Sequence, residues 1–350
     1  MNQIHPRFSL VTASLSVACF AFLHLNAALD CLADETAVPV NASNFVRAET
    51  DRYFSIAVKD GGLGKLRHRR EPAAIDRQEV VRMNRDTLYS NGVFDLDASP
   101  LTIRLPDSGS RYMSLQVVSQ DHYTIDVSYA PSKITLTKAQ VGTRYVYLIF
   151  RTLVDAENAD DVRAANALQD AIVVEQEKSG TFSVPNWDRV SLDKIRELLL
   201  NLGSFGGQKV MFGRKEEVDP VSYLIGAAGG WGGNPPSAAI YSMVYPKEND
   251  GQVAHQLTVK DVPVDGFWSI SVYNAKGFFE RNESNSYSLN NITAKPNPDG
   301  TVSIQFGGDP KSATNFLPIT PGWNYTVRLY RPRKEVLEGK WKFPEALPMK

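Results

Sequence analysis

Short apolar runs separated by turn residues recur along this chain, and they constrain its fold more than any other feature. Strand-forming residues dominate at 92–96, 101–105, 112–119, 124–128, 134–137 and 145–153, and a second series follows at 240–245, 256–259, 267–273, 301–306 and 324–330. Pro, Gly, Ser and Asp fill the gaps, and they include Asp-Gly pairs of the kind that close β-hairpins. Strands at this spacing predict a mainly β protein with two β-sandwich, jelly-roll-like domains.

Helical segments and a glycine-rich stretch separate the two series of strands. Apolar residues recur at helical spacing over 44–58 and 160–177, while Ser191 and Gly203 are placed to cap and to end a third helix over 191–202. Glycines are then frequent up to Pro236. The predicted organisation is a β-rich domain at 34–155, a helical and Gly-rich connector at 156–236, and a β-sandwich domain at 237–350.

The first residues have the order of a secretory signal peptide, which we assign to 1–33. Arg7 precedes an apolar run over 8–25, and small residues follow at Ala27, Ala28 and Ala33. Cleavage after Ala28 or Ala33 would release a periplasmic or secreted protein without a stable membrane anchor. The alternative is a single uncleaved anchor, but the run is short for a bilayer span and no basic stop-transfer flank follows it.

Charge and cysteine usage exclude several classes of partner. The net charge is −1, so no overall electrostatic attraction draws the chain to nucleic acid or to anionic lipid. The two cysteines, Cys19 and Cys31, lie in or beside the signal segment, which leaves the mature part without a disulfide framework or a thiolate metal site. We expect a small-molecule ligand, and the sequence leaves an oligomer open.

A polar block over 84–90 contradicts the strand pattern around it. Strand interiors disfavour Asn and Asp, so Asn84, Arg85 and Asp86 must either cap a turn or line a site. Local rule-breaking of this kind gathers at functional or strained positions. The sequence therefore places the functional centre in the N-terminal β domain.

Three residues are candidates for catalysis and five for ligand binding. His68, Asp86 and His122 have the chemistry of an acid-base pair or of a metal site, although their spacing is no local ligand motif, and a divalent metal stays open as cofactor. Arginine forks and hydroxyls suit a carboxylate or phosphate ligand, and the candidates are Asn84, Arg85, Tyr89, Tyr123 and Arg151.

Each of these candidates also has a structural interpretation. Arg85 beside Asp86 could form a buried ion pair, and the tyrosines could be ordinary strand aromatics. We nevertheless predict one concave pocket in the first domain, formed by His68, Arg85, Asp86, Tyr89 and His122. The chain has no Gly-x-Ser-x-Gly elbow and no P-loop, so neither a serine hydrolase nor a nucleotide site is supported.

Several blocks of the chain resemble two bacterial domain families that follow one another. The first half is similar to DUF1254 at His68, Arg70, 61–64 (GGLG), 80–83 (VVRM), 92–96 (GVFDL), 120–124 (QDHYT) and 142–146 (GTRYV). The second half is similar to DUF1214 at 231–233 (WGG), 245–247 (YPK), 257–259 (LTV), 265–269 (DGFWS), 287–289 (YSL), 294–300 (AKPNPDG) and 317–325 (LPITPGWNY). The resemblance implies a tandem β-rich fold and often export, and it implies no reaction.

Three functions remain open at this point. The first is an exported enzyme, either metal-assisted or acid-base, with its site in the N-terminal β domain. The second is a non-catalytic periplasmic protein that holds a small ligand, and the third is a structural envelope protein.

Overall fold

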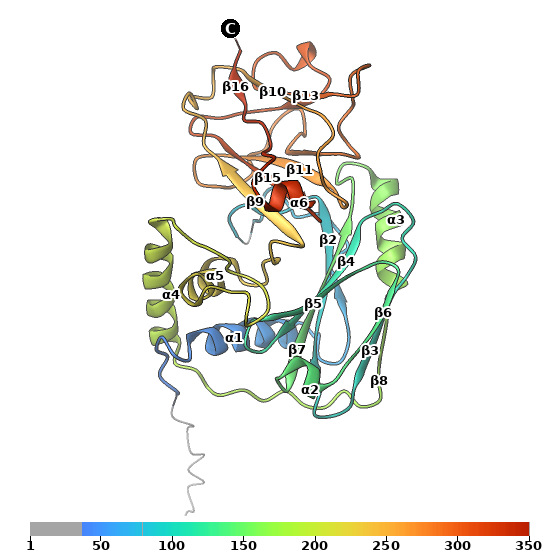
Figure 1. Cartoon of the computed structure of the whole chain (residues 1–350), viewed down its shortest axis with the longest axis vertical. Coiled ribbons are helices and arrows are strands. Elements are labelled where there is room, and N and C mark those ends of the chain that lie inside the picture. Colours follow the sequence, from blue (N-terminus) through green and yellow to red (C-terminus); the bar gives the residue numbers. More distant parts are fainter. Residues whose placement is uncertain (1–36, 79, 350) are drawn as a thin grey trace, which may run out of the picture. The chain divides into compact units, whose positions relative to one another are not determined.

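Two pairs of β-sheets form most of the described structure (Figure 1). The computed structural model describes residues 37–78 and 80–349. The predicted signal peptide at 1–33 therefore lies outside the described residues. Contacts group the chain from Ala37 onward into one unit. Within the described part, no helix has the length and apolar character that crossing a membrane requires.

The first pair of sheets is built from residues 67–176. Its larger sheet has the order β1-β2-β7-β4-β5, with the strands β1 (Arg67–His68), β2 (Thr87–Asp95), β7 (Tyr145–Leu153), β4 (Met113–Ser119) and β5 (Thr124–Tyr129). The smaller sheet has the order β6-β3-β8, with β6 (Ser132–Leu136), β3 (Leu101–Leu105) and β8 (Val173–Gln176). Alternate residues of β2, β4 and β7, among them Phe94, Leu115 and Phe150, pack against β3 in one apolar core.

Helices cover the opposite face of the larger sheet. Phe54 of α1 (Phe45–Lys59) packs against Val93 and Tyr147, and Trp231 joins this cluster from the glycine-rich stretch. The helices α4 (Arg189–Ser204) and α5 (Pro220–Gly230) pack against α1 in turn. This face therefore receives side chains from the first domain and from the connector.

The second pair of sheets is built from residues 239–348. One sheet has the order β12-β11-β15-β9, with β12 (Ser288–Asn290), β11 (Trp268–Tyr273), β15 (Asn324–Tyr330) and β9 (Ala239–Val244). The other has the order β14-β13-β10-β16, with β14 (Phe316–Leu317), β13 (Val302–Phe306), β10 (His255–Val259) and β16 (Leu347–Pro348). A shared core that includes Ile270, Val327 and Phe306 joins the two sheets.

The remaining face of the β12-β11-β15-β9 sheet is polar. Side chains alternate along a strand, so the residues between the core positions of β11 and β15 point the other way. They are Ser269, Ser271, Asn324, Thr326 and Arg328, and all of them are buried. A buried polar face needs partners from another part of the chain.

The mainly β fold is confirmed, with sheets that are antiparallel apart from the β13–β14 pair. The finer description of each half as a jelly-roll-like sandwich, and the boundaries of the segments, stay predictions. Three short helices complete the described chain, namely α2 (Lys138–Val141), α6 (Lys334–Leu337) and the 3₁₀ turn η1 (Pro310–Ser312).

The prediction of a helix over 160–177 is wrong for the second half of that range. The helix α3 (Ala159–Asp170) ends early, and Val173 begins the strand β8, which pairs with β3. Val173 and Val174 are β-branched, and pairing with a partner strand outweighs the local helical spacing.

The connector also differs from the expectation. Asp188, rather than Ser191, caps α4, because its carboxylate accepts a hydrogen bond from the Ser191 backbone N–H. The helix α5 lies inside the stretch that the sequence presented only as glycine-rich. Asp219 caps this helix and Pro220 is its first residue, a start signal that the glycines obscured.

Candidate functional site

The two residues before the polar block lie on the polar face of the second sheet pair. The backbone carbonyls of Arg82 and Met83 accept hydrogen bonds from Nη2 of Arg328, at 3.0 and 3.4 Å. The Tyr273 hydroxyl donates a hydrogen bond of 2.8 Å to the Met83 carbonyl. From Thr87 onward the block is part of β2, so the strand begins earlier than the sequence indicated. The block therefore joins the two pairs of sheets.

Asn84 connects a tyrosine from each half of the chain. Its Nδ2 lies 3.0 Å from the Tyr330 hydroxyl and 3.3 Å from the Tyr89 hydroxyl. Its Oδ1 accepts a hydrogen bond from the Asp86 backbone N–H at 2.8 Å, which fixes the orientation of the amide. The two phenols consequently lie at one place, although 241 residues of sequence separate them by their numbers.

Arg151 lies beside this pair of tyrosines and is buried without a carboxylate partner. It is directly opposite Tyr89 in the β2–β7 ladder, with its guanidinium 5.6 Å from the centre of the Tyr89 ring. Nη1 donates to Gln116 Oε1 at 2.8 Å, and Nη2 donates to the Gly232 carbonyl at 2.9 Å. Arg151 is 5% exposed, and no described carboxylate forms an ion pair with it. Such an uncompensated buried charge costs several kcal/mol, about 3–5 kcal/mol in measured cases.

Tyrosine side chains lie around the guanidinium, and the charges of these groups shift one another's pKa. Burial raises the pKa of Tyr89, but the charge of Arg151 and hydrogen bonds from Thr87 and Asn84 outweigh it and hold the pKa below its ordinary value. Burial raises the pKa of Tyr330 well above its ordinary value. Burial opposes the charge of Arg151, yet Tyr89, Tyr241 and Tyr330 raise the pKa of the guanidinium above its ordinary value. The environment therefore favours a cation at Arg151 and an anion next to it.

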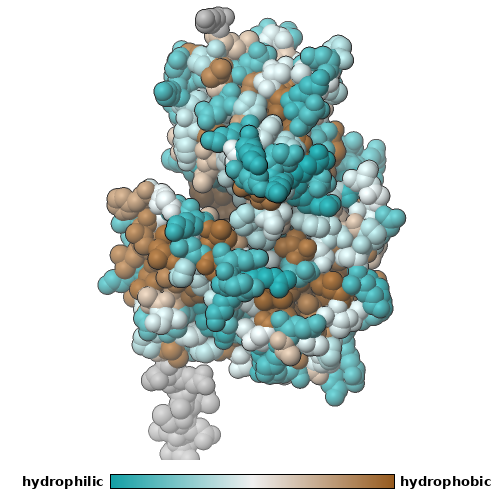
Figure 2. Space-filling view, viewed as in Figure 1, coloured by the Kyte–Doolittle hydropathy of each residue, from teal (hydrophilic) through white to brown (hydrophobic). Residues whose placement is uncertain are grey.

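This cluster, Asn84, Tyr89, Arg151, Tyr241 and Tyr330, is called the Arg151 site below. Tyr241 is 41% exposed, its ring meets that of Tyr330 edge-on at 6.4 Å, and its hydroxyl accepts a hydrogen bond of 2.7 Å from Asn234. Asn84 and Tyr89 are half-buried. Figure 2 shows the surface hollowed where β9 faces α4 and α5, with apolar side chains in the hollow. Tyr241 thus gives the site a solvent-exposed side chain.

His122 lies in an aromatic core next to the Arg151 site. Its Nε2 accepts a hydrogen bond from the Gly232 N–H at 2.9 Å, and its ring stacks on Trp231 at 5.4 Å. The ring is 3% exposed, and burial lowers the pKa of His122 to about 3. Gly232 thus donates to His122 and accepts from Arg151. Tyr123, another candidate, stacks on Tyr223 at 4.9 Å beside this core.

Asp86 and His68 lie in other surroundings. Asp86 is buried against β12, where Asn290 donates to it at 3.2 Å, and burial raises the pKa of the carboxyl. His68 pairs with Ser90, the residue after Tyr89 on β2, with Nδ1 2.7 Å from Ser90 Oγ, and burial lowers its pKa. No described hydrogen bond, ion pair or ring contact joins Asp86, His68 and His122 to one another. That they act in one pocket stays a prediction.

Arg85 pairs with a carboxylate that the sequence did not indicate. The Asp86 pairing considered above is wrong, since Arg85 Nη2 lies 2.7 Å from Glu157 Oε1 and the guanidinium covers the Tyr287 ring. Asp86 instead lies against β12, where Asn290 donates to it. The charge of Arg85 is compensated, unlike that of Arg151.

Sequence reasoning missed Tyr241, Tyr330, Gln116 and Gly232. The glycine-rich segment gave a signal, because Gly232 has a φ of +76° that favours glycine. Nothing local marked the others, since each is an ordinary strand residue that becomes polar lining only when the sheets meet.

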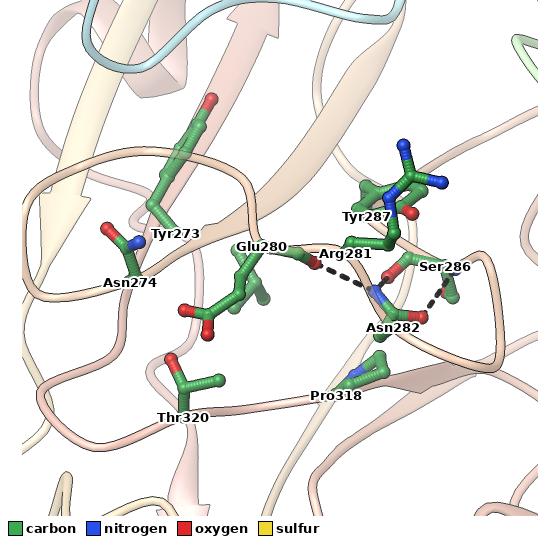
Figure 3. A pocket seen from close by; sticks show the side chains of 10 residues that line it. Tyr273, Asn274, Glu280, Arg281, Asn282, Ser286, Tyr287, Pro318 and Thr320 are labelled. Atoms are coloured by element: carbon green, nitrogen blue, oxygen red, sulfur yellow. Dashed lines mark hydrogen bonds between the residues drawn. The ribbon is translucent and has the colours of Figure 1, made fainter. Parts of the chain in front are cut away.

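Two further features carry less chemistry. Among the described residues, no group of three or more His, Cys, Asp or Glu could hold a metal ion. A cavity of about 70 Å³ is lined by residues that include Tyr273, Glu280, Arg281 and Tyr287, and Figure 3 shows its polar rim.

Residues 63–141 match the family described as "Protein of unknown function (DUF1254)", and residues 245–334 match "Protein of unknown function (DUF1214)". The chain therefore contains a DUF1254 match followed by a DUF1214 match. In the Arg151 site, Asn84 and Tyr89 come from the DUF1254 match and Tyr330 from the DUF1214 match, while Arg151 and Tyr241 lie outside both matched ranges. The site thus combines residues from both matches with residues between them.

One solved structure shows the same fold, and its name gives no activity. The VPA0106 protein from Vibrio parahaemolyticus has a TM-score of 0.66 and 17% identity, over 88% of this chain and 98% of that protein. An uncharacterised protein from Burkholderia cenocepacia has a TM-score of 0.49 and 13% identity, over 88% of this chain and 87% of that one. Among curated proteins, no sequence matches this chain.

Proposed function

We propose that this chain is an exported protein that binds a small anionic molecule at the Arg151 site. The observation that carries the proposal is the buried guanidinium of Arg151, which has amide and carbonyl partners but no carboxylate in the described chain. A guanidinium has five N–H donors. Described residues accept one hydrogen bond from Nη1 and one from Nη2 of Arg151. An anion would supply both the missing charge and the missing acceptors.

Access to the site supports a ligand rather than a purely structural charge. Tyr241 is 41% exposed and Tyr89, whose ring lies beside the guanidinium, is half-buried, so the cluster extends from the buried charge toward the surface. Clefts with a few convergent polar groups between domains are common places for small ligands. The structural envelope protein considered above would instead leave the site empty.

Calorimetry with acetate, benzoate and inorganic phosphate tests the proposal. Charge-assisted hydrogen bonds are worth about 1.5–3 kcal/mol, so Arg151→Met should weaken binding by about 10- to 100-fold. Arg104→Gln is the matched control, because Arg104 lies on β3, where it forms a half-exposed ion pair with Glu175 of β8. Tyr89→Phe keeps the charge and should weaken binding less. Equal affinity in Arg151→Met, or no binding of any of the three anions, would contradict the proposal.

Export is supported by the order of charge, apolar run and small residues at the start of the chain. The mature protein should begin between Leu29 and Asp34 and be released by osmotic shock. N-terminal sequencing of the purified protein measures this. An intact Met1 on a membrane-bound product would show that the apolar run is an anchor.

An acid-base enzyme is the second candidate, and Tyr89 favours it. The phenol is half-buried beside Arg151, which lowers its pKa, so Tyr89 could take a proton from a bound molecule. His122 is poorly suited to that role because its Nε2 is occupied by the Gly232 N–H. Turnover that disappears in Tyr89→Phe while the anion still binds would distinguish the enzyme from a binding protein.

A further inference from the structure

The edge strand β9 presents apolar side chains next to the Arg151 site. Tyr241 and Met243 alternate with Ser242 and Val244, so they share one face of the strand, and Tyr245 follows directly after it. Met243 and Tyr245 are 59% and 60% exposed. The other face, with Ile240 and Val244, packs into the core of the second sheet pair. The exposed stripe is therefore not needed to hold the sheets together.

The exposed stripe, formed by Tyr241, Met243 and Tyr245, extends from the surface toward the buried guanidinium of Arg151. Tyr241 contacts Tyr330 at its inner end, and Tyr330 shares Asn84 with Tyr89, which lies over Arg151. At the outer end, Arg82 covers the Tyr245 ring at 5.4 Å and donates a hydrogen bond to its hydroxyl. Figure 2 shows the hollow beside this strand with apolar side chains in it. An apolar surface thus ends at an uncompensated cation.

We infer that the ligand of the Arg151 site is an aliphatic carboxylate, with its head group on Arg151 and its chain over Tyr241 and Met243. This inference rests on the proposed function. Charge complementarity selects the occupant, because a planar carboxylate matches the fork of a guanidinium and its hydrocarbon chain matches the stripe. Methionine adapts its shape to flexible chains, which suits an alkyl group.

A series of acetate, butanoate, hexanoate and octanoate separates the head group from the chain. Burying one methylene is worth about 0.8 kcal/mol, or about a fourfold gain in affinity, for each methylene that reaches the stripe. Calorimetry at constant pH and ionic strength should show this rise in the wild-type protein. Met243→Ser, at an exposed position, should lower the octanoate-to-acetate affinity ratio by at least about tenfold, as expected from the loss of a few buried methylenes.

Val173→Ser on β8 is the matched control, because Val173 is exposed on the other sheet pair and should leave the ratio unchanged. If acetate and octanoate bind equally and Arg151→Met loses both, the aliphatic chain is overturned while the proposed anion site stands. If Arg151→Met leaves the affinities for acetate and octanoate unchanged, the head-group assignment is overturned. If no carboxylate and no phosphate binds, the proposed function fails as well.

Discussion

Gly232→Ala tests the backbone connection between Arg151 and His122. The Gly232 carbonyl accepts from Arg151 and its N–H donates to His122, each at 2.9 Å. Its φ of +76° is in the left-handed region, where an L-residue pays about 1–2 kcal/mol. A methyl group would also come within 3.1 Å of the buried Ile149 side chain, so Ile149 must move.

The two effects together predict that Gly232→Ala lowers the free energy of unfolding by about 2 kcal/mol. Gly229→Ala is the matched control, since Gly229 lies inside α5 without a positive φ and its nearest neighbour is likewise a side-chain methyl, that of Leu200, at 3.1 Å. Alanine is the better helix former by about 1 kcal/mol, so this control should be neutral or stabilising.

Urea unfolding followed by tryptophan fluorescence measures both variants, and Trp231 lies next to the substituted position. The wild-type slope with denaturant should be retained in both. If Gly232→Ala is as stable as Gly229→Ala, the left-handed turn and its two hydrogen bonds do not constrain this segment. The same variant should weaken anion binding, because Arg151 loses the alignment of one acceptor.

Three further outcomes follow from particular contacts. In an alkaline ultraviolet titration, Tyr89→Phe should remove the phenol that ionises first, since Arg151 lowers the pKa of Tyr89; an unchanged curve would contradict this. The pKa of Asp161 is lowered by its hydrogen bond to Arg111, so the carboxylate stabilises the fold above its ordinary pKa and this contribution disappears as pH falls. Asp161→Asn should therefore flatten the acid side of the stability curve, and a parallel curve would refute the linkage. Trp231→Ala should cost about 3–5 kcal/mol in urea unfolding, and a cost below about 1 kcal/mol would show that its ring stacks contribute little.

Much of the β architecture could be predicted because side-chain alternation is a local property. The strand β7 has the bounds that the sequence indicated, and β15 does too. The errors occur where partners at a distance decide. Val173 becomes a strand because β3 lies beside it, and Arg85 pairs with Glu157, which is 72 residues further along the chain.

The sequence by itself determined the strand pattern, the polar block over 84–90 and the chemistry available at Asn84, Tyr89 and Arg151. Only the tertiary structure decided that these three meet Tyr330 and Tyr241, while Asp86 and His68 lie in other surroundings. The physical reason is that hydrophobic alternation sets which face of a strand is buried, but not which sheet covers that face. A buried cation such as Arg151 becomes visible as unpaired only when every neighbour is in place.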